Sequence, residues 1–354
     1  MKQYKVGIIG FGFMGKTHTY AYKSIPLFYQ NLPFGIRLGT VCTAHEETAR
    51  AAMESCGFEK WTTDPDDIFN DPAIDIVNIC TPNTNHKQLI LKALAAGKHI
   101  YCDKPLTGNA AEVDEIMAAV KSHPELTTQM ALQNRFYPAV MKAKELIEAG
   151  RIGRVYHFRS EYLHSSGIDP NKKPGWKQMA EFGGGVQQDL ASHAFDLVYY
   201  LLGEFSEVNT VKETAYASRT AEDASFNFVR LKDGTPGEIF VSKIATGSAD
   251  ELNIDIRGEK GALRFSTADS SHLYYFDATV KDEGLGSTGF MAIDCQQKYP
   301  EPGGYFPSPK NGMSFLRAHT ACVYNFLAAV DKGVQTSPDI AEGAYVQKAL
   351  EGIL

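Results

Sequence analysis

A glycine-rich turn directly after an apolar strand constrains the fold of this chain most. Residues 4 to 15, YKVGIIGFGFMG, join a continuous apolar run to the spacing G-x-G-x-x-G, and a helical pattern follows. In this spacing Gly10 permits a tight turn, Gly12 lets the backbone approach a pyrophosphate, and Gly15 allows close packing of helix on strand. The pyrophosphate then lies at the positive helix N-terminus. The expected cofactor contacts at this turn are Gly10, Phe11, Gly12, Phe13, Met14 and Gly15.

Strands and helices alternate through the first third of the chain. Apolar strand patterns cover residues 36 to 43, 74 to 82 and 99 to 105, and helical patterns cover 47 to 57, 86 to 98 and 109 to 123. Such alternation is typical of a parallel sheet with helices on both faces. We therefore expect an α/β fold in which residues 1–134 form an N-terminal Rossmann domain that binds NAD(P).

The pattern changes after residue 134. Strand patterns at 154 to 163, 223 to 234, 237 to 245 and 250 to 261 are separated by glycine and charged turns. Residues 284 to 309 are rich in turn formers and are expected to be a long surface loop, and helical patterns return near 312 to 331 and 338 to 353. Residues 135–354 are therefore predicted to form a second, α+β domain with a mostly antiparallel sheet.

Charge and composition exclude several classes of function. The net charge is −7, and the chain has no basic stripe, which argues against a nucleic-acid partner. No apolar run approaches the ~20 residues that span a bilayer, and a strand pattern begins at once at the N-terminus. The six cysteines are scattered without metal-ligand spacing. We expect a cytoplasmic protein with reduced thiols, no metal and no membrane association.

An acid and an imidazole share one face of an otherwise apolar helix. In GGGVQQDLASHAFDLVYYLLG, residues 183 to 203, the side chains of Asp189, His193 and Asp196 lie within about 40° of one another on an ideal helix. A carboxylate one turn away can orient an imidazole and raise its basicity, so Asp189 and His193 are candidate catalytic residues. The alternative is a satisfied core histidine, and for Asp196 we favour a structural role.

Two further positions lie at the carboxyl ends of predicted strands. Asp103, Lys104 and Pro105 follow the strand at 99 to 105, where Lys104 either directs its ammonium at a reacting oxygen or is a surface lysine before a turn. The second strand ends at Thr43, where an acid would bind the ribose 2′-hydroxyl of NAD. Because neither an acid nor a clear cation stands there, the choice between NAD and NADP stays open.

These motifs together resemble the Gfo/Idh/MocA oxidoreductases, named for glucose–fructose oxidoreductase and inositol dehydrogenase. The resemblance covers nearly the whole chain and rests on GFGFMG (10 to 15), CTPNTNH (80 to 86), ALAAGKHIYCDKP (93 to 105), NRFYP (134 to 138) and GGGVQQDLASHAFD (183 to 196). The family usually has Glu where Asp103 stands and Gly where Ala191 stands. Many NAD-using members carry an acid at the position of Thr43.

The resemblance implies roles for individual residues. It assigns Lys104, Asp189 and His193 to the catalytic set and places Thr81, Pro82, Asn83 and His86 in a loop along the cofactor, with Thr43 and Asp103 also near it. It further implies an open sheet in the second domain that mediates a homodimer or homotetramer. Weaker candidates for substrate contact are Arg135, Arg159, His164, Trp176, Lys177 and Tyr305.

The resemblance predicts hydride transfer between a nicotinamide and a secondary alcohol or ketone of a sugar, inositol or related polyol. In that reaction His193 would serve as general base, Asp189 would orient it or bind an adjacent hydroxyl, and Lys104 would stabilise the developing oxyanion. Two alternatives stay open. One is a redox-neutral enzyme that retains NAD and cleaves glycosides, and the other is a catalytically silent sugar-binding regulator.

Overall fold

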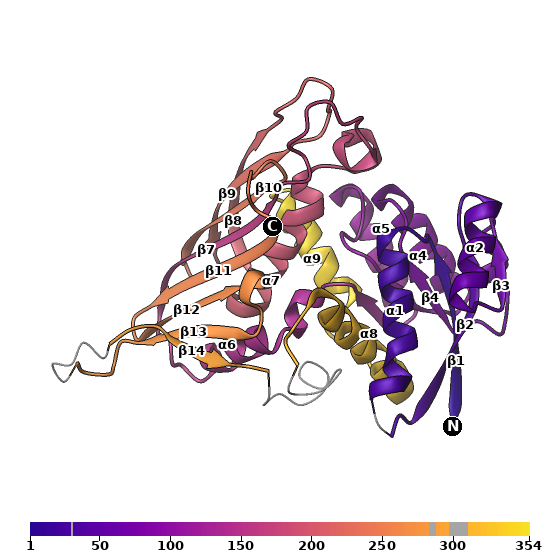
Figure 1. Ribbon diagram of the computed structural model, residues 1–354, viewed down its shortest axis with the longest axis horizontal. Helices are drawn as coiled ribbons and strands as arrows, with labels where there is room; N and C mark the ends of the chain where they lie inside the picture. Colours follow the sequence, from indigo (N-terminus) through magenta and orange to yellow (C-terminus); the bar gives the residue numbers. More distant parts are fainter. Residues whose placement is uncertain (30, 283–287, 297–310) are drawn as a thin grey trace. The chain divides into compact units, whose positions relative to one another are not determined.

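The computed structural model describes residues 1–29, 31–282, 288–296 and 311–354. It divides into two compact units (Figure 1). The first unit contains residues 1–133 and 315–347, and the second contains the described parts of residues 134–296 together with 311–314 and 348–354. Each unit has its own sheet, so the predicted α/β architecture with two different sheets is confirmed.

The first unit contains a parallel sheet with the strand order of a dinucleotide-binding domain, β3-β2-β1-β4-β5-β6. The order reverses between β1 and β4, and ligands of such sheets bind beyond the carboxyl ends of the strands at this point. The strands are β1 (Lys2–Ile9), β2 (Phe34–Cys42), β3 (Lys60–Thr62), β4 (Ile76–Ile79), β5 (His99–Cys102) and β6 (Thr128–Met130). The helices are α1 (Phe13–Phe28), α2 (Glu46–Cys56), α3 (Asp66–Phe69), α4 (His86–Ala95), α5 (Val113–Ser122), α8 (Phe315–Lys332) and α9 (Ile340–Leu350), with short turns η1 (Asn83–Asn85) and η2 (Ala110–Glu112).

Side-chain alternation along β4 and β5 explains why helices cover both faces of this sheet. Val77 of β4 and Ile100 of β5 lie in an apolar core with residues of α4 and α5. Their neighbours Asn78 and Tyr101 point to the opposite face, where they contact α1 and α8. Because successive strand residues face opposite sides, an apolar pattern without interruption buries both faces.

The position of α8 differs from the predicted domain boundary. Residues 315–347 cluster with the first unit instead of continuing a second domain over residues 135–354. The physical reason is aromatic packing, since Tyr324 stacks on Tyr29 at a centroid distance of 4.1 Å and Phe326 packs on Tyr101 at 5.4 Å. The helical periodicity of α8 indicated a buried face but not which core would bury it.

The second unit is built on an eight-stranded sheet in the order β14-β13-β12-β11-β7-β10-β9-β8. Among the described strands of this sheet, only the β7–β10 pair is parallel, so the prediction of a mostly antiparallel sheet is confirmed. The strands are β7 (Val155–His164), β8 (Phe205–Glu213), β9 (Ala224–Leu231), β10 (Pro236–Ser242), β11 (Asp250–Gly258), β12 (Gly261–Ser266), β13 (His272–Asp277) and β14 (Met291–Asp294). The helices are α6 (Pro138–Glu148) and α7 (Ser192–Leu202), with short turns η3 (Gln133–Phe136), η4 (Trp176–Gln178), η5 (Ala180–Phe182), η6 (Gln187–Ala191) and η7 (Thr267–Asp269).

Helices α6 and α7 pack on one face of this sheet (Figure 1). Inward residues such as Phe158 and Tyr162 of β7 are buried, whereas Arg159 between them is exposed. Strand β14 is a difference from the sequence analysis, which expected residues 284 to 309 to be one loop. Its four residues pair with β13, and this short segment was hidden among glycines and prolines.

A buried imidazole in the first unit predicts a pH-dependent stability. Burial lowers the pKa of His18 to about 4, although Asp103 opposes the shift. The unfolded chain therefore binds a proton near pH 6.5 that the folded chain does not bind, so stability is full above pH 6.5 and falls as the pH approaches 4. We expect a loss of about 3 kcal/mol from this residue over that range.

The measurement is urea unfolding of the wild type and of His18→Gln at pH 7 and pH 4. The difference in unfolding free energy between the two pH values should be smaller in the variant by about the same 3 kcal/mol. Comparing differences removes the contribution of other buried histidines, because both proteins contain them. Equal pH dependence in the two proteins would contradict the assignment.

Candidate active site

The glycine turn after β1 has the geometry that a dinucleotide requires. Gly10 has φ +91°, and a Cβ there would lie 2.5 Å from the carbonyl oxygen of Cys80. A Cβ on Gly15 would lie 2.3 Å from the carbonyl oxygen of Gly10, whereas a Cβ on Gly12 would meet nothing within 4 Å. The first and third glycines are thus required by packing within the protein. Gly12 instead leaves open space beside the backbone, which fits a pyrophosphate.

The N-terminus of α1 supports this fit. Gly12 is the N-cap and supplies no side-chain cap, so the first-turn N–H groups point beyond the helix. Phe11 packs edge-on against Phe58, and Phe13, which is 71% exposed, stacks on Phe315. Met14 is half-buried. The backbone from Gly10 to Gly15 is therefore the part of the turn suited to phosphate oxygens, and the aromatic side chains border it.

The ends of β4 and β5 bring the next predicted residues to the same edge. The N–H of Cys80 donates to the carbonyl oxygen of Ile9 at 2.8 Å, and that of Asp103 donates to Ile79 at 2.9 Å, so the parallel pairing continues to this edge. Asp103 accepts a hydrogen bond from the backbone N–H of Lys104 at 2.9 Å. The carboxylate thus holds the chain that carries the lysine.

The loop after β4 contains Thr81, Pro82 and Asn83. Asn83 is buried, and the hydroxyl of Thr81 has no hydrogen-bond partner among the residues that the structure describes. A buried hydroxyl without a hydrogen-bond partner lowers the stability of the folded protein. Its presence at the switch point of the sheet is consistent with a loop that is completed by a bound group.

The imidazole of His86, which the resemblance places near the cofactor, is enclosed by the main chain of the first unit. Its ring is fully buried, with Nδ1 2.9 Å from the carbonyl oxygen of Pro105 and Nε2 3.0 Å from that of Thr81. Both ring nitrogens therefore face main-chain oxygens, and burial lowers the pKa of the imidazole. His86 joins the loop after β4 to the segment that follows Lys104, so it supports these loops from beneath.

The end of β2 determines how the ribose would be held. The Thr43 hydroxyl lies 2.7 Å from the Thr48 hydroxyl and donates to the carbonyl oxygen of His45 at 2.8 Å. Arg50 pairs with Glu46 at 2.5 Å and lies over the ring of Trp61 at 5.2 Å. The guanidinium of Arg50 is thus engaged within α2 and β3, and neither cofactor is selected by a charge at Thr43.

Asp189 and His193 lie in the second unit on a helix with an irregular start. A π-helical turn, η6, covers Gln187–Ala191 and continues directly into α7. This differs from the straight helix that the spacing predicted, and such π turns are frequent at functional sites. His193 is 6% exposed, and its ring lies 5.7 Å from that of Tyr162 on β7.

The carboxylate of Asp189 lies against two ammonium groups. Nζ of Lys177 is 3.1 Å from each carboxylate oxygen, and Nζ of Lys243 is 2.7 Å from Oδ2. Lys177, predicted from the sequence, is half-exposed and also lies 5.6 Å from the centre of the Trp176 ring. Lys243 is 5% exposed and was missed by the sequence analysis. The signal was available, because Ile239, Val241 and Lys243 alternate along β10 and its end, and alternation places a lysine on the buried face.

His164 belongs to the same surroundings. It lies at the end of β7 on the face that contains Tyr162, and its Nδ1 accepts a hydrogen bond from the backbone of Ser166 at 3.1 Å. Burial lowers the pKa of His164, and the nearby charges of Asp250, Lys243 and Asp189 also act on it. Burial raises the pKa of Tyr162 well above its usual value. The second unit therefore gathers carboxylate, ammonium, imidazole and phenol groups within one face of the sheet.

Two predicted substrate contacts lie elsewhere. Arg135 is buried and forms a bidentate ion pair with Asp196, with Nε to oxygen distances of 3.0 and 3.1 Å, so it is structural, and so is Asp196. Arg159 is 58% exposed and pairs with Glu161 and Glu238. It is five residues from His164, and odd separations along a strand lie on opposite faces. Tyr305 lies outside the described residues.

The described parts of the chain carry no sign of a metal centre or of a membrane span. These residues contain no group of three or more His, Cys, Asp or Glu side chains arranged to hold a metal ion. No helix among them is long and apolar enough to cross a membrane. The six cysteines are free thiols.

Comparison with known proteins places this geometry among oxidoreductases. The family model GFO_IDH_MocA, an oxidoreductase family with an NAD-binding Rossmann fold, matches residues 4–130, and the GFO/IDH/MocA C-terminal domain matches residues 140–264. Levoglucosan dehydrogenase of Pseudarthrobacter phenanthrenivorans is 31% identical over 98% of this chain and 94% of that protein. Myo-inositol 2-dehydrogenase of Thermotoga maritima is 27% identical over 73% of this chain and 74% of that protein. A structure of levoglucosan dehydrogenase in complex with NADH and levoglucosan has a TM-score of 0.92 and 31% identity, covering 99% of this chain and 96% of that one.

Proposed function

We propose a mechanism of hydride transfer for this chain. The chain belongs to the GFO/IDH/MocA family and is an NAD(P)-dependent oxidoreductase acting on sugar or polyol hydroxyl groups. The substrate that we propose is a cyclic sugar, anhydrosugar or inositol. The observation that carries the proposal is the cluster of Asp189, Lys177 and Lys243 beside His193, which offers hydrogen-bond donors and an acceptor to several hydroxyl groups at once. A bound nicotinamide cofactor would supply the acceptor for the hydride.

His193 is the general base in this proposal. A secondary alcohol must lose its hydroxyl proton as hydride leaves the carbon, and an imidazole has a pKa suited to that transfer near neutral pH. In the reverse direction the same group returns the proton to the carbonyl oxygen. Lys104 donates a hydrogen bond to the reacting oxygen and stabilises its negative charge.

Asp189 binds substrate in this proposal and does not remove the proton. Two ammonium groups at hydrogen-bond distance favour the charged carboxylate, and a charged carboxylate only accepts hydrogen bonds. A substrate hydroxyl adjacent to the reacting carbon would donate to it, while Lys177 or Lys243 donates to a neighbouring oxygen. The geometry therefore favours the second of the two roles predicted for Asp189, binding of an adjacent hydroxyl.

A spectrophotometric screen tests the function. Purified protein is mixed with NAD or NADP and with levoglucosan, L-sorbose, myo-inositol, D-xylose or a sugar acid, and absorbance is followed at 340 nm. Growth of NAD(P)H absorbance with one of these compounds is expected, and the better cofactor follows from the same data. Glycoside cleavage without net reduction would instead support the redox-neutral alternative. Saturable sugar binding without turnover would support the regulator.

The exposed face of the large sheet supports a homo-oligomer. Phe228 of β9 and Val211 of β8 are each 60% exposed, and the half-exposed Phe226 stacks on Phe240 of β10 at 4.6 Å. Apolar side chains in adjacent strands on one open face are typical of a surface that a partner covers. We propose that a second copy covers it, forming a homodimer or homotetramer.

Sedimentation velocity tests this prediction. The wild type should sediment as a dimer or tetramer at micromolar concentration. Phe228→Asp should shift the protein toward the monomer, because the substitution would bury an unpaired charge in the interface. Lys121→Glu on α5 of the first unit is the control for a charge change away from this face, and it should leave the sedimentation coefficient unchanged. A wild type that is monomeric at all concentrations would contradict the proposal.

A further inference from the structure

The N–H and the carbonyl group of Lys243 each form a hydrogen bond with a residue that also contacts the guanidinium group of Arg219. The N–H of Lys243 donates to the carbonyl oxygen of Asp223 at 2.9 Å, and its carbonyl oxygen accepts from the N–H of Gly167 at 2.8 Å. Arg219 in turn forms an ion pair with the Asp223 carboxylate and donates from Nη2 to the carbonyl oxygen of Gly167 at 2.8 Å. These four residues form a closed circuit of hydrogen bonds, which we call the Arg219 circuit.

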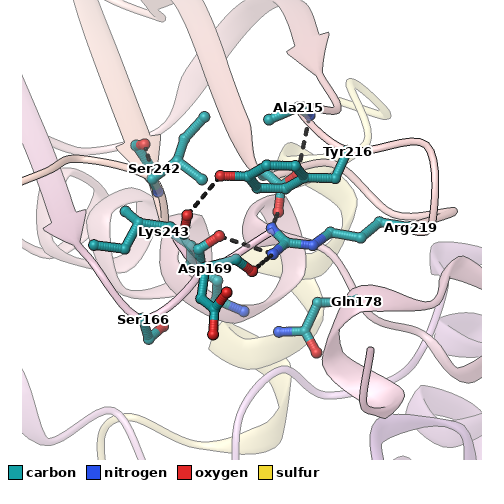
Figure 2. A network of polar contacts seen from close by, with 12 residues as sticks. Ser166, Asp169, Gln178, Ala215, Tyr216, Arg219, Ser242 and Lys243 are labelled. Carbon is teal, nitrogen blue, oxygen red and sulfur yellow. Dashed lines mark hydrogen bonds and ion pairs between the residues drawn. The ribbon is translucent and has the colours of Figure 1, made fainter. Parts of the chain in front are cut away.

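The circuit is buried and closely packed. The side chains of Arg219 and Asp223 are 3% and 2% exposed. A Cβ on Gly167 would lie 2.9 Å from the carbonyl oxygen of Lys243 and 3.2 Å from Nη1 of Arg219, so the glycine allows the close approach. The guanidinium lies against the ring of Tyr216 (Figure 2), with its central carbon 4.3 Å from the ring centre. The Tyr216 hydroxyl donates to the carbonyl oxygen of Ile168 at 2.7 Å.

Arg219 and Asp223 lie in the connection between β8 and β9. This connection also contacts the two other segments around Asp189. The N–H groups of Thr220 and Ala221 donate to the carbonyl oxygen of Gln178, which follows Lys177. Glu222 accepts hydrogen bonds from Val186 at its carbonyl oxygen and from Gln187 at its carboxylate, at the start of the π turn. Residues 219 to 223 therefore contact the backbone beside both lysines and beside the turn that carries Asp189.

We propose that Arg219 is a positioning residue, which sets the Lys243 ammonium against the Asp189 carboxylate and so orders the substrate end of the site. This inference rests on the proposed function for its catalytic consequence, but the circuit itself does not depend on it. Arg219 acts through Lys243 and is not a catalytic residue. A guanidinium is required because its planar fork serves two acceptors in different directions, which one ammonium group cannot do with the same geometry.

The first measurement is residue-resolved amide hydrogen exchange of Arg219→Lys without substrate. In the wild type the amides of Gly167 and Lys243 are hydrogen-bonded and should be protected. In the variant we expect their exchange to rise at least about tenfold, while amides of β11 keep wild-type protection. Arg230→Lys is the matched control, since Arg230 donates to the carbonyl oxygen of Gly234 on the exposed side of β9. Unchanged exchange at both amides in Arg219→Lys would overturn the proposal.

The second measurement separates positioning from general destabilisation. With the sugar identified in the screen, Arg219→Lys should lower kcat/KM by about 10- to 100-fold, chiefly through the KM of the sugar, while the Kd of NADH stays as in the wild type. If Arg219→Lys unfolds, Tyr216→Phe replaces it, since it removes only the hydrogen bond to Ile168 and should give the same pattern at smaller size. Wild-type sugar kinetics, or equal losses for sugar and NADH, would overturn the proposal. If no sugar is turned over, the exchange experiment still decides the circuit, and only the proposed function fails.

Discussion

Replacing His193 by Ala is expected to lower kcat by about 10²- to 10⁴-fold, the usual contribution of general acid–base catalysis. The variant should bind NADH with the Kd of the wild type, because the glycine turn and the loops that fit the cofactor belong to the first unit. The fall should be largest near neutral pH and should shrink as hydroxide replaces the missing base. Stopped-flow absorbance at 340 nm in a single turnover measures the chemical step directly.

His157→Ala is the control for removing an imidazole from the same unit. His157 is exposed on β7, on the face opposite to Tyr162, so its loss should leave turnover unchanged. Turnover of His193→Ala within threefold of the wild type would exclude the imidazole as the base. A matching loss in Lys104→Met, with normal NADH binding, is expected from the role of the ammonium on the reacting oxygen.

Replacing Arg135 by Met is expected to lower the free energy of unfolding by about 3–5 kcal/mol. The Asp196 carboxylate is 1% exposed, and removing its cation leaves a buried charge without compensation. The double variant Arg135→Met/Asp196→Leu should regain most of the loss, because an apolar pair of similar volume needs no compensation. Urea unfolding followed by circular dichroism measures all three proteins.

A surface pair provides the comparison for this experiment. Arg50 and Glu46 form an exposed ion pair on α2, and Arg50→Met should change stability by less than about 1 kcal/mol. If Arg135→Met were no more destabilising than Arg50→Met, Arg135 would not be a structural residue. Its original assignment as a substrate contact would then be open again.

Patterns of neighbouring residues predicted much of the first unit, including its glycine turn and its parallel sheet. The glycine turn was predictable because Gly10 and Gly15 are each required by a close contact within a few residues or with the adjacent strand. The parallel pairing of the strands followed from the alternation of strand and helix patterns. The predicted roles of individual side chains there, and a cytoplasmic location, stay predictions.

The substrate end was less predictable because it depends on contacts between distant segments. Lys243 is 54 positions from Asp189, and only the folded sheet places its ammonium at 2.7 Å. Arg135 and Arg159 were predicted to contact substrate because of their charge. The guanidinium of Arg135 is instead buried in an ion pair with Asp196, and strand alternation places Arg159 on the opposite face from His164. The strand parity of Arg159 was readable from the sequence, whereas the partner of Arg135 was not.

The central claim is that this chain moves hydride from a sugar carbon to a nicotinamide. The most direct test is to incubate the enzyme with NAD(P) and the sugar found in the screen, deuterated on its ring carbons, and to analyse the reduced cofactor by mass spectrometry and NMR. We predict one deuterium at C4 of the nicotinamide and a ketone in the sugar. Sugar conversion without deuterium in the cofactor would contradict the account.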